Sequence, residues 1–202
     1  MNAIRKIFIL VYFTTIIIAL SSCNQLQQQK ATTTIDSTTA WAMLSFEKAD
    51  SVNPVLSPGK NMFMDPILKM QIAWDKKDVF NPAIVVKEDK IYMLYRAQDM
   101  VGLPGGTSRI GLAESNDGFH FTRMAQPVFY PDNDAYKKYE WQGGCEDPRV
   151  VEDGKGTYYM TYTAYDGKVA RLLVATSNDL LHWTKYGPVF ADAYHGKYLN
   201  KW

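Results

Sequence analysis

The sequence is poor in cysteine and histidine and has almost no excess of charge. Two cysteines and three histidines occur in 202 residues without the spacing of metal ligands, so we predict no metal site and no bound cofactor. The formal net charge is +1 and the basic residues are scattered, which excludes the basic patch that nucleic-acid binding requires. A long amphipathic helix is also missing, which leaves a β-rich fold as the expectation.

The N-terminal residues have the pattern of an export signal. Arg5 and Lys6 precede an apolar run at 7–20, which is too short for a comfortable membrane span. The residues LSSC that end at Cys23 resemble a bacterial lipobox, which implies cleavage before Cys23 and acylation of its sulfur. We therefore expect residues 1–22 to be a lipoprotein signal peptide. The exported protein would attach to a membrane only by its lipid, on the periplasmic side or at the cell surface. An ordinary signal peptide with an incidental cysteine is the alternative.

Residues 23–45 and 46–202 differ in composition. The segment after Cys23 is polar and without period, so we predict a flexible tether. From residue 46 onward, short apolar and aromatic runs are broken by Gly, Pro, Asn and Asp every eight to twelve residues, which is typical of many short strands. Aromatic residues make up 13% of the chain, which suits a β-rich core and also stacking on sugar rings. With Cys23 lipidated, Cys145 has no disulfide partner, and we expect it to be a small buried side chain.

Two segments of the chain repeat each other at an offset of 61 to 66 residues. Residues 81–95 and 146–162 each contain a proline, a β-branched strand, an acidic or glycine turn and a Tyr-Met strand, and 109–121 matches 171–183. Four strands are predicted in each repeat, roughly at 82–86, 91–96, 108–113 and 119–123, and at 148–152, 157–163, 169–176 and 181–184. Four antiparallel strands at this period are typical of a propeller blade.

Several polar side chains recur at equivalent places in both repeats. We assign these pairs structural roles: Asp117 and Asp179 in closing a turn, Arg109 and Arg171 in the scaffold, and His120 and His182 in packing. His195 has no repeat partner, and we place it in a loop near the propeller axis.

The two repeats are too few to close a propeller. A leading strand at Pro54, Val55 and Leu56 precedes them, as in propellers where the first strand completes the last blade. A closed ring needs roughly four to eight blades. We therefore expect the chain to be the N-terminal part of a longer protein, from either a truncated gene product or a partial sequence.

The residues at the start of each repeat are the first candidates for chemistry. The first strand of each blade lines the central channel of a propeller, so Asn81, Glu146 and Asp147 are expected to converge there. Residues 143–149 read GGCEDPR, in which paired glycines permit close approach of a ligand and an acid pair stands beside a proline and an arginine. A carboxylate whose pKa is raised by partial burial can protonate a departing glycosidic oxygen.

Several segments together resemble glycoside hydrolase family 130. The segments are DVFNPA at 78–83, YMLYR at 92–96, GGCEDPRVV at 143–151 and TYYMTYTAYDG at 157–167. The resemblance covers about residues 46–202 and implies an all-β, five-bladed propeller of which this chain covers the first two to three blades. It also implies an enzyme that cleaves β-mannosidic linkages with inversion, with an oligosaccharide substrate and inorganic phosphate as co-substrate in the phosphorylases.

The same resemblance assigns roles to individual residues. Asp147 is implied to be the general acid, which in the phosphorylases acts through a sugar hydroxyl, and Asn81 and Arg96 are implied to line the mannose-binding subsite. Further substrate-binding candidates are Glu146, Arg149 and Asp166. The alternative roles are a turn at the start of a strand for Asn81 and an ion pair between blades for Arg96.

Three functions remain open from the sequence. Phosphorolysis and hydrolysis are not separated, because the family's phosphate-binding residues and the second carboxylate for activating water belong largely to later blades. A non-catalytic glycan-binding surface lipoprotein and an inactive gene remnant are the alternatives to an enzyme.

Overall fold

A computed structural model describes residues 47–101 and 105–192. The predicted signal peptide, Cys23, the whole tether and His195 lie outside these residues. All the strands belong to one compact unit that begins at Ala49. Within the described part of the chain, no helix is long and apolar enough to cross a membrane.

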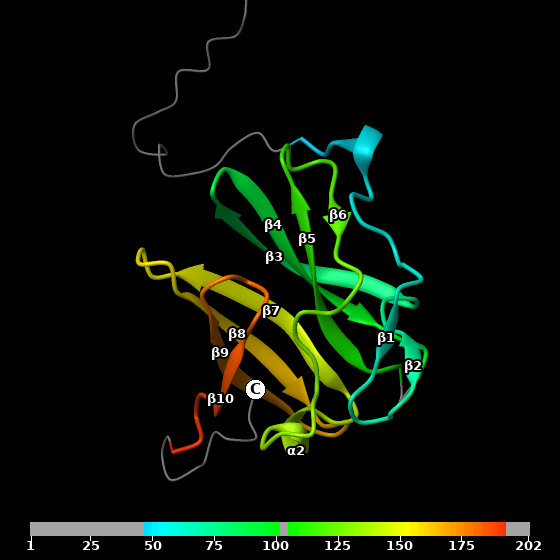
Figure 1. The fold of residues 1–202 in the computed structure, drawn as a ribbon, viewed down its shortest axis with the longest axis vertical. Coiled ribbons are helices and arrows are strands. Elements are labelled where there is room, and N and C mark those ends of the chain that lie inside the picture. The colour runs from blue at the N-terminus through cyan, green and yellow to red at the C-terminus, as the bar shows by residue number, and fades with distance from the viewer. Residues whose placement is uncertain (1–46, 102–104, 193–202) are drawn as a thin grey trace, which may run out of the picture. The chain divides into compact units, whose positions relative to one another are not determined.

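Two four-stranded antiparallel units make up most of the fold (Figure 1), which confirms the predicted pair of blades. The first blade consists of β3 (Asp78–Lys87), β4 (Lys90–Gln98), β5 (Ser108–Ser115) and β6 (Thr122–Arg123). The second consists of β7 (Gly144–Glu152), β8 (Tyr158–Tyr165), β9 (Ala170–Ser177) and β10 (Thr184–Pro188). A single parallel pair, Ser108 with Gly144, joins the two blades. The predicted outer strands began too early, because 119–121 and 181–183 belong to the turns that precede β6 and β10.

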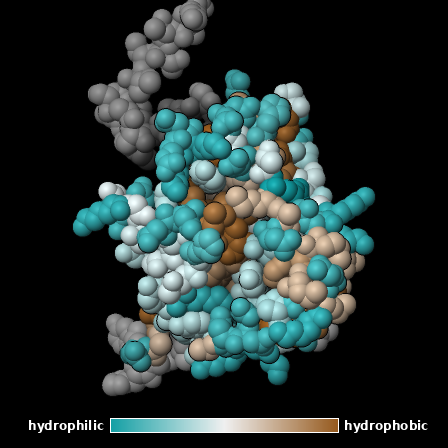
Figure 2. Space-filling view, in the orientation of Figure 1, coloured by the Kyte–Doolittle hydropathy of each residue, from teal (hydrophilic) through white to brown (hydrophobic). Residues whose placement is uncertain are grey.

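A small hairpin covers the first blade in place of the predicted leading strand. Pro54, Val55 and Leu56 form bends, so the prediction of a strand there is wrong. The hairpin consists of β1 (Met62–Met64) and β2 (Gln71–Ala73) and follows the short 3₁₀ helix η2 (Asp50–Val52). Its inner side chains pack with Trp74 against buried residues of β4 and β5. On the visible face, moderately hydrophobic residues gather over this hairpin, where three methionines are about half exposed (Figure 2).

The main core lies between the two blades. Val85 and Leu94 of the first blade share one cluster of buried residues with Met160 and Tyr162 of the second. On the opposite face of the second blade, Val151 is 67% exposed, although Val85, its counterpart in the first repeat, is only 8% exposed. In the first blade this face is covered by the second blade, whereas the same face of the second blade is open among the described residues.

The turns after β5 and β9 are closed by side chains, as predicted. Ser115 Oγ accepts the Gly118 amide at 2.9 Å, and Asp117 Oδ1 accepts the His120 amide at 2.8 Å. The packing role predicted for the two histidines is wrong, because the His120 and His182 side chains are 78% and 87% exposed. Each imidazole instead contacts the aspartate of its own turn at 2.7 Å. The hydrogen bonds from the side chain and the backbone amide of His120 help to hold the pKa of Asp117 below its usual range.

Of the paired glycines, Gly144 serves the contact between the two blades, whereas Gly143 packs against Tyr165 of its own blade. Gly144 has a φ of +115°, and a Cβ added there would overlap the backbone of Ser108. A Cβ on Gly143 would overlap the ring and the carbonyl of Tyr165. The prediction that these glycines admit a ligand to the backbone is therefore wrong at Gly144, where the space is filled by β5.

We expect Gly144→Ala to destabilise the chain substantially. The substitution combines left-handed backbone, which costs of order 1–3 kcal/mol for a residue with a Cβ, with a clash against rigid backbone. Urea unfolding would measure the free-energy loss, with Gly154→Ala as the control, since Gly154 also has positive φ but nothing lies within 4 Å of its added Cβ. Equal losses in the two variants would contradict the role of Gly144 in the blade contact.

Candidate functional site

Two equivalent bulges bring the side chains of Asn81 and Asp147 together from the first strands of the two blades. The register of β3 against β4 shifts between Phe80 and Ala83, and that of β7 against β8 shifts between Glu146 and Arg149. Asn81 and Asp147 have φ values of 47° and 49°, a conformation that asparagine and aspartate tolerate better than most residues. A bulge removes a residue from the ladder and re-aims its side chain. Asn81 thus lies inside β3 and is not a turn residue at its start.

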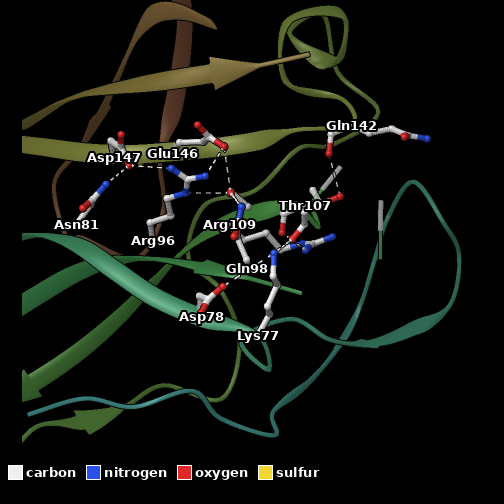
Figure 3. Close-up of polar contacts among 12 residues, drawn as sticks. Lys77, Asp78, Asn81, Arg96, Gln98, Thr107, Arg109, Gln142, Glu146 and Asp147 are labelled. Carbon is white, nitrogen blue, oxygen red and sulfur yellow. Dashed lines mark hydrogen bonds and ion pairs between the residues drawn. The ribbon is translucent and has the colours of Figure 1, made fainter. Parts of the chain in front are cut away.

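Arg96 on β4 joins the two blades through two carboxylates of β7 (Figure 3). Its Nη2 lies 2.6 Å from Glu146 Oε1 and its Nη1 lies 3.1 Å from Asp147 Oδ1. The amide of Asn81 also donates to Asp147 Oδ1, at 2.7 Å. The alternative of an ion pair between blades for Arg96 is therefore confirmed. The ion pair also places four of the predicted site residues in one group, which we call the Arg96 cluster: Asn81, Arg96, Glu146 and Asp147.

Ser108 and Gln98 support the Arg96 cluster and were not predicted. The buried hydroxyl of Ser108 accepts hydrogen bonds from Arg96 Nε at 3.0 Å and Gln98 Nε2 at 3.2 Å, and it donates to Glu146 Oε1 at 3.2 Å. The ring of Phe80 lies under the guanidinium, 4.5 Å from its carbon. These contacts hold the guanidinium plane from several sides, so its position does not depend on the carboxylates alone.

The contacts of Asp147 distinguish its two oxygens. Both hydrogen bonds from Arg96 and Asn81 reach Oδ1, and Oδ2 has no partner among the described residues. The Asp147 side chain is 34% exposed, compared with 13% for Glu146. Asp147 therefore keeps an unpaired oxygen on the more exposed of these two side chains.

The pKa of Glu146 is raised above its usual value. Burial is the largest cause, and the Asp147 charge adds to it, while Arg96 and the Ser108 hydroxyl act in the opposite direction. The folded chain therefore binds a proton at Glu146 more tightly than the unfolded chain does.

This shift predicts how Glu146→Gln changes the pH dependence of stability. A group with a raised pKa contributes stability that is fully present below its unfolded pKa, about 4.5, and that is lost as the pH rises through the raised value. We therefore expect the free energy of unfolding of the variant, relative to the unaltered chain, to increase as the pH rises across this window. Urea unfolding between pH 4 and pH 7 would measure it. A difference that does not change with pH would show that burial of Glu146 carries no such penalty.

A hollow of about 280 Å³ adjoins the Arg96 cluster. It is lined by residues of both blades: Arg96, Gln98, Gly105, Gly106, Gly143, Glu146, Tyr165 and Ala170. Its size is near the lower end of the range for small-molecule pockets, ~300–1,000 Å³. One guanidinium and two carboxylates give the cluster a net negative charge when both acids are ionised. Such a wall favours a neutral polyol over a phosphate.

The structure does not bring Arg149 and Asp166 into the Arg96 cluster. Arg149 is exposed, and its guanidinium donates to the carbonyl of Pro148 at 2.8 Å. Asp166 lies in the turn between β8 and β9, where it accepts two backbone amides and pairs with Arg171 at 2.7 Å. Asp166 thus stabilises a hairpin, and Arg171 has the scaffold contact that its place in the repeat suggested. In the described residues, no group of three or more His, Cys, Asp or Glu side chains could hold a metal ion.

The blades and the cluster define the chain as part of a β-propeller with an acidic site on the first strand of its second blade. The family model described as beta-1,4-mannooligosaccharide phosphorylase matches residues 47–198, so the chain belongs to glycoside hydrolase family 130. The solved structure of a glycosyl hydrolase from Bacteroides ovatus is 51% identical, with a TM-score of 0.76, over 80% of this chain and 46% of the other.

Two further relatives carry more informative descriptions. One solved structure was described with the finding that the GH130 family of mannoside phosphorylases contains glycoside hydrolases that target beta-1,2 mannosidic linkages in Candida mannan. It is 49% identical, with a TM-score of 0.76, over 80% of this chain and 46% of the other. The 1,2-beta-oligomannan phosphorylase of Thermoanaerobacter sp. (strain X514) is 30% identical over 69% of this chain and 51% of its own length. The chain spans about half the length of the curated relatives it matches.

Proposed function

We propose that the protein containing this chain cleaves β-1,2-linked mannosides with inversion and that Asp147 is its general acid. The observation that carries the proposal is the Asp147 carboxylate, which is fixed through Oδ1 by Arg96 and Asn81 and keeps Oδ2 open. The family description names β-1,4 linkages. By contrast, the descriptions of the two curated phosphorylases and of the 49% identical structure name β-1,2 linkages, and these relatives match most of this chain.

In this mechanism the described residues supply the acid and hold the sugar. Arg96 and Asn81 fix the carboxylate plane, so a proton on Oδ2 can pass to the departing oxygen directly or through a sugar hydroxyl. Glu146, Gln98 and Tyr165 line the adjoining hollow and can contact the hydroxyls and the ring of the same sugar. Inversion requires a water or phosphate that attacks from the opposite face of the sugar ring. When water attacks, a second carboxylate acts as the base and typically lies ~6.5–9.5 Å from the first.

The similarity to relatives favours hydrolysis over phosphorolysis as the proposed reaction. The relative described with hydrolases is 49% identical to this chain, whereas the curated phosphorylase relatives are 30% and 29% identical.

Incubation of the intact protein with β-1,2-mannobiose, with and without phosphate, tests the proposal. We expect free mannose at the same rate in both buffers. Mannose 1-phosphate that forms only in phosphate would replace hydrolysis by phosphorolysis. Binding of the sugar without product in either buffer would instead favour the glycan-binding alternative.

We also propose that the protein is exported and anchored by lipid at Cys23. The support is the charged and apolar pattern that leads to LSSC, and Cys23 lies outside the described residues. Mass spectrometry of the protein expressed in a Gram-negative host would show a diacylglyceryl adduct on Cys23, and Cys23→Ser would remove it. An unmodified N-terminus at another residue would contradict the proposal.

A further inference from the structure

A second and larger hollow, of about 360 Å³, lies at the outer strand of the second blade. One wall comes from 128–136, the segment that leads to α2 (Lys137–Glu140), and the other from 181–185, where β10 begins. In the strand order of the sheet, β10 is at one end, three strands from β7, which carries Glu146 and Asp147. We call this hollow the rim site, and none of the residues that line it belongs to the Arg96 cluster.

The rim site has an aromatic wall whose orientation is fixed. The indole nitrogen of Trp183 donates to the carbonyl of Leu180 at 3.1 Å, and the indole meets the buried Phe129 edge to face at 6.4 Å. Tyr130 and Tyr136 line the same hollow. A preformed aromatic surface can take the apolar face of a ring without loss of side-chain freedom.

Several polar groups of the rim site still have hydrogen-bonding capacity. The ammonium of Lys185 is fully used, by the Tyr130 carbonyl at 3.0 Å, Asp134 at 3.1 Å and Glu140 at 2.6 Å. By contrast, the hydroxyls of Tyr130 and Tyr136 and the Oδ2 of Asp132 have no hydrogen-bond partner among the residues that the structure describes. Two donor-acceptor hydroxyls and one acceptor are the groups that a polyhydroxylated ligand can use.

The charges of the rim site narrow the class of ligand. Asp132 and Asp134 oppose an anion, and the one ammonium in the wall is already neutralised by Asp134 and by the buried Glu140. A ligand with an apolar face and neutral hydroxyls satisfies both the indole and the free oxygens.

We propose that the rim site binds a neutral hexopyranose unit and forms a second sugar-binding site, separate from the Arg96 cluster. The identity of the sugar as a mannose unit of the same substrate depends on the proposed function. A second site at the outer strand would let the protein hold a long glycan while one terminus occupies the site at the Arg96 cluster.

Calorimetric titration of the full chain with a β-1,2-mannooligosaccharide tests the rim site. We expect the double variant Tyr130→Phe/Tyr136→Phe, which keeps both rings and removes both free hydroxyls, to weaken one binding event by at least about tenfold because it removes bonds to the ligand. Asp147→Asn should leave that event unchanged, and thermal unfolding should show both variants folded.

Other outcomes would overturn the rim site. The first is that the double variant leaves the oligosaccharide titration unchanged. The second is that no binding remains when Asp147→Asn and Arg96→Met are combined. The third is that glucosamine binds more tightly than mannose. The mannobiose cleavage assay is separate: lost cleavage with intact rim binding removes the proposed function, and intact cleavage without rim binding removes only the second site.

Discussion

Asp147→Asn is expected to lower the turnover of β-mannosides by the intact protein by roughly 10²–10⁴-fold, the usual contribution of a general acid. Asparagine has the same shape and can still accept the bonds of Arg96 and Asn81 at its oxygen, but it has no proton to give. The Michaelis constant should change far less than kcat, because the sugar contacts of the neighbouring residues remain. Initial rates of mannose release measure both.

Asp78→Asn is the matched control for this variant. Asp78 begins β3, its side chain is 53% exposed, and its nearest cationic group, Lys77, is 3.9 Å away. The same change of acid to amide should therefore leave turnover within about twofold. If Asp147→Asn retains the full rate while Asp78→Asn also does, Asp147 has no part in the proton transfer. A mannoside with an activated leaving group, which needs little protonation, should recover much of the lost rate if Asp147 is the acid.

The repeat made most of the fold predictable. Two copies of the same pattern give two copies of the same four strands, and the equivalence of Asn81 with Asp147 follows from the proline after each. The bulges confirm this equivalence, because each strand shifts register at the same place. The convergence of these two side chains was thus predictable before any contact was known.

The supports of the Arg96 cluster could not be predicted. Ser108 and Gln98 belong to no motif. Their bonds to each other and to Arg96 lie within the β4–β5 pair, whereas the bond of Ser108 to Glu146 depends on how β5 lies beside β7, which one parallel pair between blades fixes. Arg149 lies two residues from Asp147 in sequence, yet the bulge at Glu146 and Asp147 separates the two, and Arg149 is exposed. Proximity in sequence therefore misled where the strand changes register.

The rim site was missed for a different reason. One wall comes from 128–136, of which 130–136 has no counterpart in the repeat. The other comes from 181–185, whose first residues form a turn that was predicted as a strand. The aromatic and acidic residues of 128–136 are the signal in the sequence for a ligand site there. They do not show which strand this segment will face.

The scaffold role of Arg109 is confirmed, and it leads to the largest expected effect on stability. Arg109 is fully buried, with its Nη2 2.6 Å from Asp65 Oδ2 and its Nη1 2.6 Å from Asp99 Oδ2. Both carboxylates are 1% exposed, and each also accepts backbone amides of its own loop, so neither can turn to water. The arginine thus joins the turn of the β1–β2 hairpin to the loop that leaves β4.

Arg109→Met is expected to reduce the free energy of unfolding by about 3–5 kcal/mol, because it leaves two buried carboxylates without a counter-charge. Such a loss is a large part of the ~5–15 kcal/mol that stabilises a typical domain. Adding Asp65→Asn and Asp99→Asn to the variant should recover part of the loss, since both uncompensated charges then disappear while the amide contacts stay. Urea unfolding of the three proteins measures both steps. If Arg109→Met costs less than about 1 kcal/mol, or the added asparagines lower stability further, the charge pairing does not hold the hairpin to the blade.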